Sequence, residues 1–160
     1  MTILHTDSIP VRTPGRLHWL AIAAILVAAL IACAPLLIDG AVDGHSIEYN
    51  LVWLKHFAAQ LGAGDWYPRW LMGMNRGAGS PVFFYYAPLP YYITSIGVGL
   101  LPQMSLNVQL AMGEWLLIAL SGVTFFVYAR RHAGVVAAAA AAVLYMLLPY
   151  HFEVDLLVRQ

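Results

Sequence analysis

The stretch "LHWLAIAAILVAALIACAPLLI", from Leu17 to Ile38, carries no formal charge and is almost wholly apolar. An α-helix rises about 1.5 Å per residue, so about 20 apolar residues cross the ~30 Å hydrocarbon core of a bilayer. His18 and Trp19 stand at its start, where amphipathic rings favour the membrane interface. The stretch therefore predicts a membrane-spanning helix.

The composition of the whole chain supports this interpretation. Of its 160 residues, 61% are hydrophobic and 10% are charged, whereas soluble domains carry about 25% charged residues. A chain with so few charges cannot cover a water-facing surface, so we expect an integral membrane protein with membrane lipid as its partner. The formal net charge is zero, which gives no indication of a nucleic-acid partner.

The single cysteine, Cys33, excludes an internal disulfide. It ends the string "LIAC" after a basic start and an apolar run, as in the cleavage box of bacterial lipoproteins, so cleavage and lipidation at Cys33 is one interpretation. The apolar run continues to Ile38 and more hydrophobic segments follow. This favours a retained signal anchor in which Cys33 is a small packing residue.

The order of polar and apolar segments predicts the domain organisation. Residues 1–16 form a polar tail whose Arg12 and Arg16 favour a cytoplasmic N-terminus, and residues 17–160 form a single membrane domain. The loop 39–81 then lies outside. Within it, apolar residues recur at steps of three and four, which predicts an amphipathic helix lying in the membrane interface: Ile47, Leu51, Leu54, Ala58 and Leu61.

Three further apolar runs follow, at 82–101, 106–129 and 134–150. We therefore expect an all-α polytopic protein of the bacterial cytoplasmic (inner) membrane. It has three to four hydrophobic helices and an interfacial amphipathic helix in its first outward loop.

Two topologies remain open for the run 82–101. If it crosses, "RRH" (residues 130–132) lies outside, against the tendency of basic loops to stay in the cytoplasm. If it does not cross fully, this basic loop falls inside and the C-terminal "HFEVDLLVRQ" falls outside. Pro88 and Pro90 weaken the run as a straight helix, which favours the second topology.

The first candidate site is "DGAVDGHSIEY", at the outer end of the first span. A carboxylate of Asp39 or Asp43 can act as a general base on a hydroxyl, or bind a divalent cation such as Mg²⁺ or Mn²⁺. His45 is a candidate substrate-binding residue beside them. The alternative is that these residues only end one helix and cap the next.

The second candidate site combines Arg69 and Arg76 with the glycine-rich "GMNRGAGSP" (residues 73–81). Glycines allow left-handed backbone, successive amides can form an anion nest, and arginines can bind a phosphate in bidentate geometry. The alternative is a tight turn with snorkelling arginines. The rings of "FFYYAPLPYY" can line a lipid-chain groove or form an aromatic belt.

Two other groups of polar residues are candidates. Glu153, Asp155 and Arg159 follow the last apolar run and could complete a site with the first loop, or be a solvated helix end. Glu114 stands inside an apolar run, where a carboxylate is a functional candidate by default. The alternative is that it sits near an interface, at the start of the 106–129 helix.

The order "YPRW…G.N.G.G.P.FFYYAPLPYY", then "P.H.E.D…R" after a later span, resembles the bacterial polytopic membrane proteins labelled 6-pyruvoyl-tetrahydropterin synthase-related. More distantly, the layout is similar to GT-C integral-membrane glycosyltransferases. The soluble pterin synthase is a zinc enzyme with a three-histidine site. The six histidines here include no H-x-H pair, so we infer no pterin chemistry.

The GT-C resemblance implies sugar transfer from a polyprenyl-phosphate donor at the outer membrane face. In that picture Asp39 or Asp43 takes the proton of the acceptor hydroxyl. The donor phosphate is held by Arg69, Arg76 or Arg159, and a second acidic group comes from Glu153 or Asp155.

GT-C enzymes have many more spans than this chain. We therefore expect an N-terminal fragment of a longer module that is inactive alone, with its other membrane helices missing from this chain. The alternative function is a non-catalytic membrane protein: a transport or flippase component, or an assembly subunit that pairs through its Ala-rich run.

Overall fold

The computed structural model describes residues 15–39 and 47–148. Within these ranges the chain is all-helical, without strands, which confirms the predicted all-α class. The elements are α1 (Arg16–Ala32), α2 (Ala34–Asp39), α3 (Ile47–Gly62), the 3₁₀ helix η1 (Asn75–Gly77), α4 (Val82–Tyr85), α5 (Leu89–Leu100), α6 (Leu106–Ala129) and α7 (Val135–Met146).

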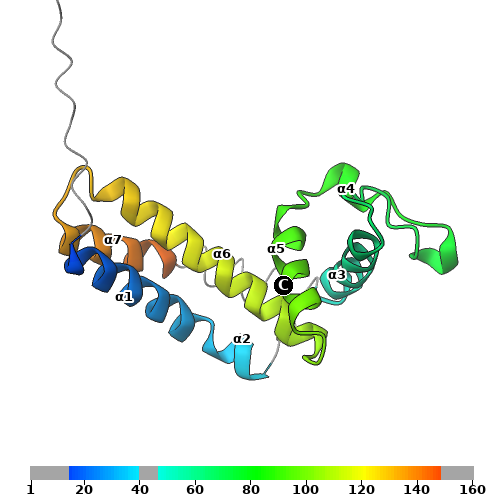
Figure 1. Cartoon of the computed structure of the whole chain (residues 1–160), viewed down its shortest axis with the longest axis horizontal. Coiled ribbons are helices and arrows are strands. Elements are labelled where there is room, and N and C mark those ends of the chain that lie inside the picture. Colours follow the sequence, from blue (N-terminus) through cyan, green and yellow to red (C-terminus); the bar gives the residue numbers. More distant parts are fainter. Residues whose placement is uncertain (1–14, 40–46, 149–160) are drawn as a thin grey trace, which may run out of the picture.

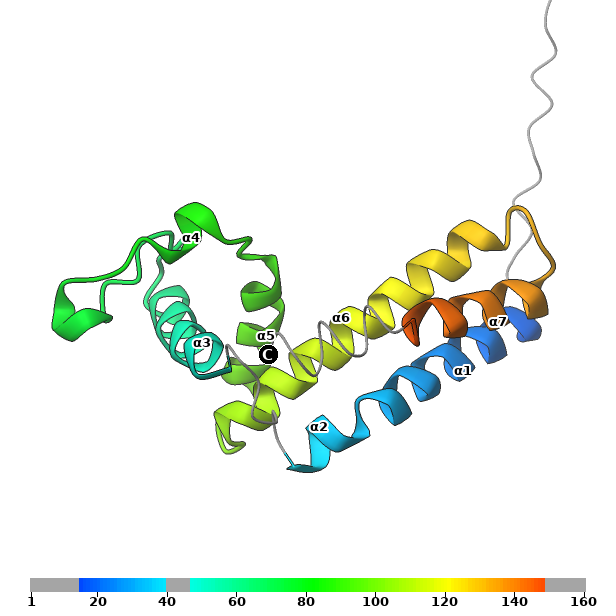
Figure 2. The ribbon, with the colours of Figure 1, turned by 180° about the vertical axis from the view of Figure 1, so that it is seen from behind.

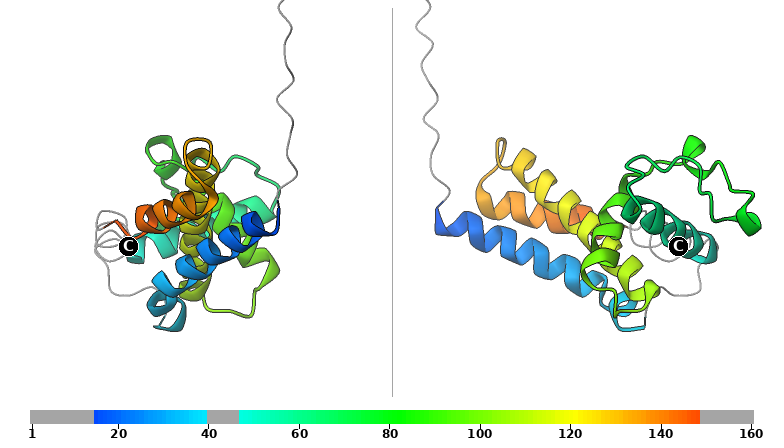
Figure 3. Two further views of the ribbon diagram at one scale, coloured as in Figure 1. Left: turned by 90° about the vertical axis from the view of Figure 1, so that its left-hand side faces the viewer. Right: turned by 45° about the vertical axis from the view of Figure 1, so that its right-hand side comes forward.

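The helices form two parts, which we name the bundle (α1, α2, α6 and α7) and the lobe (residues 47–100, with α3, η1, α4 and α5) (Figure 1). The end-on view in Figure 3 shows α1, α6 and α7 packed side by side. The buried core of the bundle is rich in small side chains, which allow close helix approach. It consists of Ala21, Ile25, Ala29, Ala119, Phe126, Ala138, Ala142 and Met146.

Helix α6 runs antiparallel to α1. The ring of His18, in the first turn of α1, contacts Phe126 near the end of α6, with 6.5 Å between ring centroids. At the other end, Leu36 of α2 packs with Ala111 in the first half of α6. Between these levels, a Cβ added at Gly122 would meet side chains of both α1 and α7, so the three helices approach closely there.

The first apolar run forms two helices instead of one, and its crossing of a membrane stays a prediction. It forms α1, of 17 residues, and α2, of six, separated at Cys33. Pro35 has no N–H, and its ring clashes with the carbonyl of Ile31 four residues before, which breaks the helix. Helical bonding resumes at once, because the Leu37 amide donates to the Cys33 carbonyl at 3.0 Å.

Within the described ranges, α6 is the one helix that is long and apolar enough to cross a membrane by length and composition. It has 24 residues, and its bounds match the predicted run 106–129. The apolar helices α1 and α7 are shorter. The sequence predicts three to four spans. Among the described residues, one helix, α6, meets both the length and the hydropathy criterion for a span.

The run 82–101 divides into α4 and α5 around Pro88, as the prolines predict. Proline is favourable at the start of a helix, where its missing N–H has no helical partner. Helix α5 has 12 residues and is therefore about 18 Å long, too short to cross a ~30 Å core. The prediction that this run is not one straight helix is confirmed.

The predicted amphipathic helix at 46–62 is present as α3, but its apolar stripe packs against protein. Leu54 is fully buried and clusters with Ile47 and with Leu110 of α6. Phe57, which lies off the predicted stripe, is also fully buried. The periodicity correctly indicated which residues of α3 share one face. This face packs against α5 and α6, whereas the sequence predicted that it contacts lipid.

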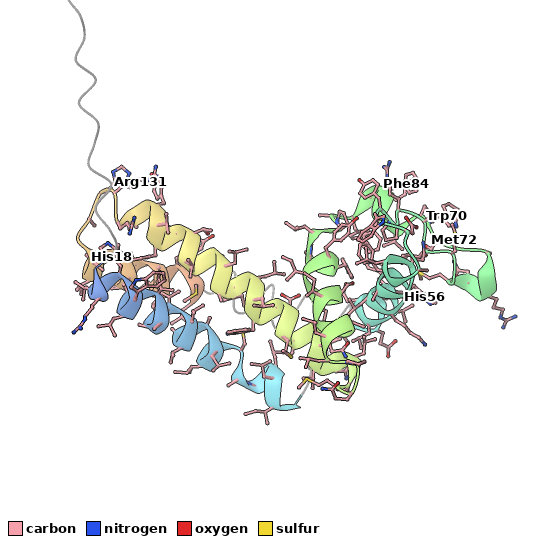
Figure 4. The ribbon with its side chains drawn as sticks, viewed as in Figure 1. His18, His56, Trp70, Met72, Phe84 and Arg131 are labelled. Atoms are coloured by element: carbon pink, nitrogen blue, oxygen red, sulfur yellow. The ribbon has the colours of Figure 1, made fainter. Side chains whose placement is uncertain are left out.

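Three basic residues lie at the end of the bundle opposite the lobe, which itself carries Lys55, Arg69 and Arg76. Arg16 opens α1, and Arg130 and Arg131 follow α6 directly, so all three stand where α1 begins and α6 ends. Figure 4 shows His18 and Arg131 at this end, and labelled side chains of the lobe at the other. Helix α2 ends at Asp39, at the lobe end.

Candidate functional site

An aromatic cluster around Phe57 builds the lobe. Its ring centroid lies 4.9 Å from those of Phe83 and Tyr92 in edge-to-face arrangements, and 6.0 Å from that of Tyr91. Such pairs are more favourable than face-to-face stacking because ring edges are positive and faces negative. Leu71 is also fully buried in this cluster. The rings thus join α3, α4 and α5 into one unit.

A single amide, Gln60, holds the segment after α3 in place. Its Nε2 donates to Asp65 Oδ2 at 2.9 Å and to the Trp70 carbonyl at 3.0 Å, and its Oε1 accepts from the Met72 amide at 2.8 Å. The Tyr92 hydroxyl donates to the carbonyl of Trp66 at 2.6 Å. In the sequence, Gln60 is only a polar residue near a helix end, so this role could not be predicted.

Replacing Gln60 with leucine should open the 65–72 segment. The change removes three hydrogen bonds, each contributing about 1 kcal/mol, so we expect a destabilisation of roughly 2–3 kcal/mol. Faster thermolysin cleavage within residues 63–81 would report the opening. Gln103→Leu, at an exposed position, is the control and should leave the cleavage rate unchanged. Equal rates for wild type and Gln60→Leu would contradict this role.

The glycine-rich stretch forms a closed turn between Leu71 and Ser80. Their backbones exchange two hydrogen bonds, of 2.9 and 3.2 Å. The amides of Gly77 and Gly79 both donate to the Met74 carbonyl, and the Ala78 amide donates to the Asn75 carbonyl. These amides are therefore occupied inside the turn, and the anion nest predicted there is not formed by them.

The backbone of this turn is left-handed at several positions, as its glycines predict. The φ angles are 92° at Gly77 and 80° at Gly79. Two residues with side chains share this conformation, Asn75 at 52° and Arg76 at 58°. The Asn75 side chain compensates by donating to the Gly79 carbonyl at 2.9 Å.

The structure places the two predicted arginines differently. The guanidinium carbon of Arg69 lies 4.2 Å from the ring centroid of Phe84 and 5.5 Å from that of Tyr67. Cations are attracted to ring faces, which holds this side chain at the surface of the lobe. Arg76 lies in η1, within the closed turn, whereas Arg69 precedes the turn.

The lobe exposes several large apolar side chains, including the two rings that Arg69 contacts, Tyr67 and Phe84. Each is between 45% and 83% exposed: Trp66, Tyr67, Trp70, Met72, Phe84 and Tyr85. Contiguous exposed apolar surface marks interaction sites with lipid, protein or ligand. An arginine among such rings can bind an anionic group beside an apolar chain, which is the chemistry of a lipid phosphate.

Glu114 lies on α6 where α5 and α3 pack. It is partly buried and follows Gly113, which approaches Thr94 of α5. Burial, and then the negative charge of Glu114, raise the pKa of Tyr91, whose hydroxyl donates to Asn50 Oδ1 at 2.7 Å. The carboxylate thus belongs to a polar junction of three helices.

The other predicted site residues fall largely outside the described ranges. Asp39 is the last residue of α2, whereas Asp43, His45, Glu153, Asp155 and Arg159 lie outside the described residues. In the ranges that the structure describes, no group of three His, Cys, Asp or Glu residues could hold a metal ion. The divalent cation at Asp39 and Asp43 stays a prediction.

Comparisons with protein-family models, with curated proteins and with solved structures found no match to this chain. The resemblance of its motifs to the polytopic family and to GT-C enzymes therefore stays a prediction.

Proposed function

We propose that this chain is a multi-pass protein of the bacterial cytoplasmic membrane and the N-terminal portion of a GT-C-like glycosyltransferase. Its donor would be a polyprenyl-phosphate-linked sugar at the outer face. One observation carries the proposal: Arg16, Arg130 and Arg131 lie at one end of the bundle, and the lobe lies at the other. Basic residues of short loops favour the cytoplasm, whereas those of a long connection such as 40–105, with Lys55, Arg69 and Arg76, have little influence, so the lobe faces outward.

The outer surface of the bundle supports a membrane location. Large apolar side chains of α1, α6 and α7 are more than half exposed, including Leu20, Ile31, Leu120, Val136 and Leu144. Exposing apolar surface to water is unfavourable by about 25 cal/mol per Å², whereas lipid removes this penalty. We infer two crossings, by the kinked α1–α2 pair and by α6; α7, of 12 residues, packs along them.

The lobe would supply the donor-phosphate site. The planar guanidinium of Arg69, held against Phe84, retains N–H donors for bidentate contact with a phosphate. The surrounding rings would contact the first units of the lipid chain. Asp39, at the same end of the bundle, would act with Asp43 as the base for the acceptor hydroxyl.

A second candidate function is an assembly subunit. The outer face of α7 is exposed and rich in small residues, including Ala137 and Ala140. Small residues allow close packing of a further helix in lipid, so this face favours association with other membrane helices.

Removing the charge of Arg69 tests the proposed site. We expect Arg69→Ala to weaken binding of polyprenyl phosphate to the detergent-solubilised chain about tenfold or more, because charge-assisted hydrogen bonds contribute about 1.5–3 kcal/mol. Microscale thermophoresis with the lipid phosphate in mixed micelles would measure the affinity. Arg131→Ala, at the opposite end, is the matched control. Unchanged affinity in Arg69→Ala, or an equal loss in Arg131→Ala, would contradict the site.

A further inference from the structure

We propose that α5 immerses one exposed stripe in the lipid of the outer leaflet without crossing the membrane. This rests on the proposed membrane function and adds a lipid contact made by a helix that does not cross. The stripe consists of Leu89, Ile93, Ile96 and Leu100, spaced by four, three and four residues, so its members share one helix face. Leu89, Ile96 and Leu100 are 63%, 62% and 73% exposed.

The opposite face of α5 is fixed by protein contacts. Thr94 and Ser95 are buried, and a Cβ at Gly113 of α6 would lie 2.0 Å from Thr94 Oγ1. Tyr91 is bonded to Asn50 of α3. Because α6 and α3 hold these residues, α5 cannot rotate to bury its stripe.

The direction of α5 differs from that of the bundle helices. Helices α1 and α7 run along α6, whereas α5 runs steeply across its first half (Figures 1 and 2). If α6 crosses the bilayer, α5 is therefore tilted away from the direction of the crossing, and its 12 residues are too few to cross. Interfacial helices bury an apolar face about 5–10 Å into the boundary between headgroups and chains.

The sequence around α5 favours lipid over water as the occupant of this face. The 37 residues from Gly77 to Gly113 include no Asp, Glu, Lys, Arg or His. A water-exposed segment of that length would carry about nine charged residues at the average content. Apolar side chains are exposed on α6 as well, at Leu116 and Leu120.

Spin labels test the proposal in the full chain, reconstituted in vesicles of phosphatidylethanolamine and phosphatidylglycerol. In a Cys33→Ala background, Ile96→Cys and Leu100→Cys carry the label on the stripe. Gln103→Cys serves as the exposed polar control, and Leu120→Cys as the α6 reference. The measured quantity is the ratio of the collision rate with oxygen to the collision rate with a water-soluble nickel chelate. We expect this ratio to be at least several-fold higher for the labels at residues 96 and 100 than for the label at residue 103.

Two results would overturn the proposal. Nickel accessibility at residues 96 and 100 equal to that at residue 103 would place the stripe in water. Immobilised labels shielded from both reagents would show that another protein segment covers it. The label at residue 120 separates the two causes of failure. If residue 120 is accessible to oxygen and residue 96 is not, this inference alone is contradicted. If neither residue is accessible to oxygen, the proposed membrane function is contradicted.

Discussion

Phe57→Ala is expected to unfold the lobe. The side chain is fully buried and makes three of the ring contacts that join α3, α4 and α5. Truncating a buried phenylalanine usually destabilises a core by about 3–5 kcal/mol, because transfer energy is lost and a cavity is left. Thermal unfolding in detergent, followed by near-ultraviolet circular dichroism of the aromatic residues, would show an early loss of signal.

The matched control is Phe84→Ala, because Phe84 is 51% exposed on the same lobe. Its loss should change stability by about 1 kcal/mol or less. The far-ultraviolet signal of Phe57→Ala should keep the contribution of α1, α6 and α7, whose core is separate. Equal effects of both substitutions, or complete loss of helix in Phe57→Ala, would contradict the two-part fold.

Gly79→Ala is expected to open the Leu71–Ser80 turn. Gly79 has φ of 80°, and an added Cβ would lie 1.8 Å from Trp70 Nε1. Left-handed backbone costs a residue with a Cβ about 1–2 kcal/mol, and forcing Trp70 aside adds about 1–3 kcal/mol. The rate of proteolysis within the turn would measure the combined effect.

Gly77→Ala isolates the contribution of Trp70. Gly77 has φ of 92°, and an added Cβ would meet nothing within 4 Å, so this substitution introduces backbone strain alone. We expect cleavage in Gly79→Ala to be at least tenfold faster than in Gly77→Ala. Similar rates would show that Trp70 does not pack over Gly79.

Local patterns in the sequence predicted several elements of the fold. The apolar run 106–129 became α6, the periodic segment at 46–62 became α3, and Pro88 with Pro90 divided the run 82–101. These features depend on hydrophobicity and backbone chemistry within a few residues. The kink before α2 follows from the same proline chemistry, at Pro35.

Features that depend on tertiary contacts could not be predicted. Periodicity showed which residues of α3 share a face, but not that α5 and α6 cover Leu54. The sequence shows that Arg69 has aromatic neighbours, but not which rings it contacts. The glycines of the turn predict left-handed backbone, but not that their amides donate to the Met74 carbonyl. The bonds of Gln60 join residues 5 to 12 positions apart across a turn, beyond any local pattern.

The central claim is that the bundle crosses a membrane with its basic end in the cytoplasm and its lobe outside. Side-specific cysteine labelling tests it most directly, in a Cys33→Ala background with His132→Cys at the basic end and Met72→Cys on the lobe. In intact cells, an impermeant maleimide should label residue 72, and residue 132 only after permeabilisation. Labelling of residue 132 in intact cells, or of residue 72 only after permeabilisation, would contradict the claim.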